Sequence, residues 1–65
     1  MKRKIQVNSQ KEVDDILSTL EKSQNIFKVN SSSSAVDVEF EDRYYQFLVD
    51  KIEMLGYSKG DLVEG

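Results

Sequence analysis

Residues 35–41, Ala-Val-Asp-Val-Glu-Phe-Glu, alternate between apolar and acidic side chains. This alternation is typical of a strand with one face in the core and one face in water. The side chains expected to face the core are Val36, Val38 and Phe40, and those expected to face water are Asp37, Glu39 and Glu41. We therefore expect the central strand of a half-buried sheet here.

Two neighbouring segments also have strand character. Residues 3–8 alternate around Ile5 and Val7, and residues 26–30 contain Phe27 and Val29 at the same spacing. Four serines at 31–34 separate the second segment from the central strand. A β-hairpin closed by a solvated serine loop is therefore predicted.

Two helices are predicted from caps and helical spacing. Ser9-Gln10-Lys11-Glu12 has the capping-box pattern, and apolar residues then recur at i, i+3, i+4 and i+7, which predicts a helix over residues 10–23. A second helix is expected to begin after Asp42 and to end at Gly56, where glycine permits a left-handed stop.

These elements predict one α+β domain over residues 1–57, a two-layer split β-α-β-β-α fold. The sheet is expected to be three-stranded, antiparallel or mixed, with strand order 2-3-1 and both helices on one face. Residues 58–65 are expected to form a C-terminal tail or one short helical turn beginning at Ser58. Neither sheet edge carries proline, so either edge is open to pairing.

The composition restricts the chemistry of this chain of 65 residues. It contains neither cysteine nor histidine, which excludes disulfides, thiol or imidazole catalysis and the common zinc sites. No phosphate-binding loop, nucleophile–base pair or calcium-loop spacing is present in the sequence. We therefore expect a protein without enzymatic activity, cofactor, metal or small-molecule substrate.

The cellular setting is expected to be the cytoplasm, with no membrane partner. No apolar run approaches the roughly 18 residues of a membrane helix. The basic residues at 2–4 lead into a segment of alternating apolar and polar residues, not into the apolar core of a signal peptide. The composition is rich in serine, lysine and asparagine and lacks proline, which we interpret as that of a bacterial or phage accessory protein.

The charge is unevenly distributed along the chain. Residues 1–33 carry six basic and four acidic side chains, net +2, whereas residues 34–65 carry three basic and eight acidic ones, net −5. We expect an interaction or regulatory module that forms a homodimer and binds an unidentified protein. This expectation follows from the small core, the open sheet edges and the uneven distribution of charge. The candidate interaction surface comprises Asp37, Glu39, Glu41, Tyr45, Asp50 and Glu53.

Two alternatives involve DNA or RNA. The first is a nucleic-acid-associated regulator that uses Lys2, Arg3 and Lys4 to contact phosphates. The second is an acidic DNA mimic that inhibits a DNA-binding protein with the carboxylates of the second half. We prefer the interaction module, because the strand spacing that buries Phe27 and Phe40 leaves acids, not aromatic rings, on the open sheet face.

Overall fold

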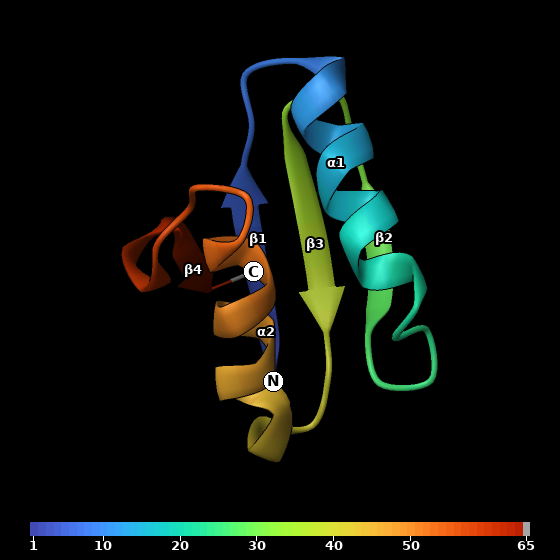
Figure 1. Ribbon diagram of the computed structural model, residues 1–65, viewed down its shortest axis with the longest axis vertical. Helices are drawn as coiled ribbons and strands as arrows, with labels where there is room; N and C mark the ends of the chain where they lie inside the picture. Colours follow the sequence, from blue (N-terminus) through green and yellow to red (C-terminus); the bar gives the residue numbers. More distant parts are fainter. Residues whose placement is uncertain (65) are drawn as a thin grey trace.

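The computed structural model describes residues 1–64, which form an α+β domain (Figure 1). The strands are β1 (Lys2–Gln6), β2 (Lys28–Ser31), β3 (Ala35–Glu39) and β4 (Leu62–Glu64). The α-helices are α1 (Gln10–Glu21) and α2 (Tyr45–Glu53), and short 3₁₀ helices lie at Asp42–Tyr44 and Lys59–Asp61. The prediction of an α+β chain with two helices and an antiparallel sheet is confirmed.

The sheet has the strand order β2-β3-β1-β4 across the described residues. Each neighbouring pair is antiparallel, with Ile5 opposite Val36 between β1 and β3, and Val29 opposite Val38 between β2 and β3. The registers therefore put the apolar side chains of neighbouring strands on the same face, as the alternation in residues 35–41 requires.

The prediction of a three-stranded sheet is wrong, because the segment after Ser58 adds a fourth strand in residues 1–64. The Ser58 N–H donates to Asp61 Oδ2 at 2.8 Å, and this cap turns the chain into β4. Leu62 then lies opposite Ile5 and is only 8% exposed. Burial of Leu62 and pairing along β1 together stabilise a strand that is too short to have a periodic signal of its own.

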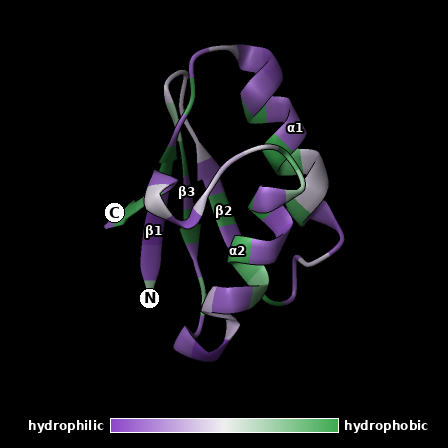
Figure 2. Ribbon diagram, turned by 60° about the vertical axis from the view of Figure 1, so that its left-hand side comes forward, coloured by the Kyte–Doolittle hydropathy of each residue, from purple (hydrophilic) through white to green (hydrophobic). Residues whose placement is uncertain are grey.

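Both helices cover one face of the sheet, and the turned view in Figure 2 separates the two layers. α1 packs against β2, β3 and α2. The core lies between the layers, and its largest fully buried side chains are Ile5, Val13, Ile16, Leu20, Val36, Val38, Leu48 and Ile52. The opposite face of the sheet is uncovered by helices.

Specific residues fix the ends of the helices. At the start of α1, Ser9 Oγ accepts the N–H of Glu12 at 3.3 Å. After α2, Gly56 has φ +92°, and the Tyr57 N–H donates back to the Ile52 carbonyl at 3.2 Å. This left-handed stop directs Tyr57 back toward the core and sets the path of the segment that becomes β4.

Candidate functional site

The outer edge of β2 presents backbone groups to solvent. β2 is a terminal strand of the sheet, and only its inner side pairs with β3. The Ser32 N–H donates to the Ala35 carbonyl at 2.8 Å. Because hydrogen-bonded pairs recur at every second residue of an antiparallel ladder, the even-numbered residues of β2 bond to β3. The residues whose N–H and C=O groups point outward are Val29 and Ser31.

A groove of about 390 Å³ runs beside this edge, between α1 and β2. It is lined by Leu17, Leu20, Glu21, Gln24, Phe27, Lys28 and Val29, and we call it the α1–β2 groove. Helical spacing puts Leu17 and Leu20 on the side of α1 that faces the sheet, and strand spacing puts Phe27 and Val29 beneath them. The groove therefore has an apolar interior and a polar margin next to unpaired backbone.

The floor of the α1–β2 groove is held by stacked aromatic rings. Phe27 is 2% exposed, and its ring meets Phe40 edge to face at a centroid distance of 5.6 Å. On another side it stacks on Phe47 at 5.8 Å. Phe47 belongs to the apolar stripe of α2 but is 37% exposed. Edge-to-face and stacked contacts are favourable aromatic arrangements, and here they hold the Phe27 ring in place at the floor of the groove.

The open sheet face carries alternating charges from three strands. Lys4 lies opposite Asp37, and Glu39 lies between Lys2 and Lys28. A shallow hollow of about 210 Å³ lies among these side chains. Among the described residues, Asp37 Oδ1 is buried without a hydrogen-bond partner. The neighbouring lysines carry the opposite charge, but among the described residues no lysine lies within 4.0 Å of the Asp37 or Glu39 carboxylate oxygens.

The residues predicted as one interaction surface lie on separate layers. Asp37 and Glu39 are on the open sheet face, where Asp37 is half-buried. Asp50 and Glu53 are exposed on α2, which covers the opposite face, and Gln46 Nε2 donates to Asp50 Oδ1 at 3.0 Å. The acidic groups of β3 and α2 therefore do not combine into one patch.

Glu41 and Tyr45, the other members of that predicted surface, contact basic side chains. Arg43 Nε forms an ion pair with Glu41 Oε2 at 2.8 Å. Tyr45 is half-buried, with the Arg3 guanidinium 5.7 Å and the Lys59 ammonium 5.9 Å from its ring centre. Tyr45 thus helps to attach the 3₁₀ turn before β4 to α2.

The basic N-terminal residues are also divided between the two faces. Lys2 and Lys4 line the hollow on the open face, whereas the Arg3 guanidinium lies over Tyr45 on the helix side. The N-terminal ammonium donates to the Phe40 carbonyl at 2.7 Å and lies 3.4 Å from an Asp42 carboxylate oxygen. Lys2, Arg3 and Lys4 therefore do not form one continuous basic patch.

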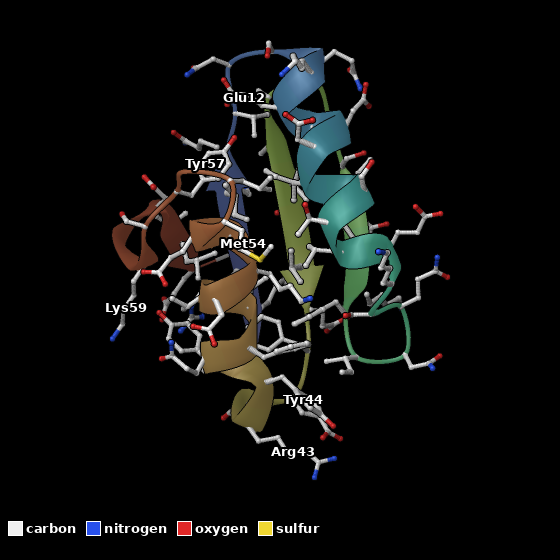
Figure 3. All side chains as sticks on the ribbon, viewed as in Figure 1. Glu12, Arg43, Tyr44, Met54, Tyr57 and Lys59 are labelled. Atoms are coloured by element: carbon white, nitrogen blue, oxygen red, sulfur yellow. The ribbon has the colours of Figure 1, made fainter. Side chains whose placement is uncertain are left out.

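A second hollow, of about 300 Å³, lies between the helices on the outer side of the molecule. It is lined by Ser18, Thr19, Lys22, Lys51 and Met54. Figure 3 shows Met54 on the helix layer, and its side chain is 77% exposed. The residues that line this hollow belong to the two helices and their C-caps, so it lacks the unpaired strand backbone found beside the α1–β2 groove.

Metal ligands and membrane-spanning helices are the next two features to consider in the described part of the chain. Within residues 1–64, no three ligating side chains gather closely enough to hold a metal ion. In the same part of the chain, no helix is long and apolar enough to cross a bilayer.

Comparison with protein families, curated proteins and solved structures finds no match for this chain. We therefore infer function from the edge of β2 and the groove beside it.

The sequence prediction missed the α1–β2 groove because it assigned all apolar residues of α1 and β2 to the core. Leu17 and Val29 are only half-buried in the structure. The sequence held no signal for the groove, because helical spacing gives the apolar side of α1 without giving its position over β2.

Proposed function

We propose that this protein is a small, non-enzymatic interaction module that binds an extended segment along the outer edge of β2. The observation that carries the proposal is that Val29 and Ser31 turn their backbone groups outward on the same edge where Val29 lines the α1–β2 groove. In such strand addition, main-chain hydrogen bonds supply affinity and the groove selects alternate side chains.

The two ends of the sheet differ in what they offer a ligand. β4, at the other end, has three residues, and its Val63 is 45% exposed on the open face. β2 has four residues and the apolar groove at its side. Because a ligand at β2 gains apolar burial as well as backbone hydrogen bonds, β2 is the preferred edge.

Titration with extended peptides tests the proposal. We would follow amide shifts of ¹⁵N-labelled protein with an acetylated octapeptide of alternating threonine and valine, and with a matched peptide carrying proline at two central positions. We expect shifts at residues 27–31 and at Leu17 and Leu20 with the first peptide, and none with the second. Shifts confined to α2 or the open face, or no binding by the first peptide, would overturn the proposal.

Two variants of Ser31 make this test specific to the edge. In Ser31→Pro, proline removes an N–H that points outward and so blocks strand addition, while the bonds to β3 remain. Ser31→Ala keeps the N–H and is the matched control. We expect peptide binding to survive in S31A and to be lost in S31P, and equal binding by both would contradict the proposal.

A further inference from the structure

We propose that the segment received by the β2 edge is β2 of a second copy of this chain, antiparallel and in one defined register. Val29 of one protomer lies opposite Ser31 of its partner, and a two-fold axis passes beside Asn30. This inference rests on the proposed function, because it names the partner for the same edge. The two sheets then join as one continuous sheet with the β2 strands at its centre.

The hydrogen-bond pattern favours this register. A hydrogen-bonded antiparallel pair needs outward N–H and C=O groups on both residues, and in β2 these belong to Val29 and Ser31. Pairing Val29 with Ser31 uses both residues in both protomers. A register with Val29 opposite itself would need Phe27 for its next pair, but the Phe27 N–H already donates to the Ser23 carbonyl at 2.9 Å.

The charges on the open face favour the same register. Lys28 and Asn30 are exposed, and their strand spacing places them on that face. With Val29 opposite Ser31, Asn30 faces Asn30 of the other copy, and Lys28 faces Ser32. The two Lys28 side chains are then four positions apart, about 14 Å along the strand. A register with Lys28 opposite itself would instead place like charges in direct contact.

The helix side becomes self-complementary in this arrangement. A two-fold axis perpendicular to the sheet brings the α1–β2 groove of one protomer to the corresponding groove of the other. The apolar interiors, including the half-buried Leu17 and Val29, meet beneath the two α1 helices. The polar margin of each groove, at Glu21 and Gln24, is left at the periphery. The two-fold pairing thus gives hydrogen-bond partners to the outward N–H and C=O groups of β2 and also covers the apolar surface of the groove.

Cysteine cross-linking of the full chain tests the register, since the sequence contains no cysteine of its own. Asn30 facing Asn30 is a non-hydrogen-bonded pair, whose Cα atoms lie about 4.5 Å apart, within the range that a disulfide spans. We expect Asn30→Cys to form a covalent dimer in a glutathione redox buffer. Lys28→Cys is the matched control and is expected to form no disulfide-linked dimer, because the two copies of residue 28 are about 14 Å apart in this register.

Sedimentation of the cysteine-free protein at micromolar to millimolar concentration completes the test. We expect a concentration-dependent dimer, whose dissociation constant rises about tenfold or more in S31P and changes little in S31A. Cross-linking through Lys28→Cys in place of Asn30→Cys would overturn the register. A monomer at all concentrations would overturn self-pairing, but the proposed function would stand if the extended peptide still bound at residues 27–31.

Discussion

The Tyr57 hydroxyl donates to Glu12 Oε2 at 3.0 Å and so joins the segment after α2 to the first turn of α1 (Figure 3). The same Glu12 oxygen accepts the Asn8 N–H at 3.3 Å. Partial burial, together with this hydrogen bond and the charges of Glu12, Asp15 and Asp61, raises the pKa of Tyr57 from 10.0 to about 12. One carboxylate thus supports both the entry to α1 and the chain leading to β4.

We expect Tyr57→Phe to lower the free energy of unfolding by about 1 kcal/mol at neutral pH, since it removes a half-exposed hydrogen bond to a charged group. Because the folded pKa of Tyr57 exceeds the unfolded one, the stabilisation is complete below pH 10 and is lost as the pH rises to about 12. Chemical denaturation of both proteins from pH 7 to 12 measures this. A stability difference that stays constant up to pH 12 would contradict the assignment.

Leu62 anchors β4, so its truncation should affect both stability and the sheet edge. We expect Leu62→Ala to cost about 2–3 kcal/mol, because it removes a buried side chain opposite Ile5. Val63 is 45% exposed, and Val63→Ala is the control, expected to cost less than about 0.5 kcal/mol. Thermal unfolding measures both. Equal losses in the two variants would show that β4 is not held through Leu62.

Substitution of Gly56 tests the left-handed stop that follows α2 and directs the chain back toward the core. Its φ is +92° and no atom lies within 4 Å of the place where a Cβ would be, so alanine is opposed by backbone conformation alone. We expect Gly56→Ala to cost about 1 kcal/mol. At Gly60 the added Cβ would lie 3.7 Å from Ser58 Oγ, an ordinary contact, so Gly60→Ala should be tolerated. Denaturant unfolding compares them, and a more harmful G60A would refute this explanation.

The sequence predicted the elements whose periodicity is carried by their own residues. Val36 and Val38, assigned to the core from the alternation in residues 35–41, are 0% exposed. β4 was not predictable in this way, because its three residues become a strand only through pairing with β1. Phe47 illustrates the same limit, since its exposure depends on how the first turn of α2 lies against Phe27.

The candidate site was predictable only in part. The absence of proline and bulge signals indicated that the sheet edges are open. It did not indicate that β4 would pair with the outer side of β1 and so leave β2 as the open edge of the predicted strands. The α1–β2 groove depends on where α1 lies over the sheet, and helical spacing gives the apolar side of a helix without giving its position. Asp37 and Asp50 were grouped by proximity in sequence, whereas the layers separate them.

Amide hydrogen exchange at single-residue resolution, measured across protein concentration, tests pairing at the β2 edge most directly. We predict that Val29 and Ser31 exchange rapidly in dilute protein and become protected as concentration rises, while Lys28 and Asn30, bonded to β3, stay protected throughout. Protection at Val29 and Ser31 that does not change with concentration would contradict pairing at the β2 edge. Concentration-dependent protection that appears at Glu64 of β4 instead would also contradict it.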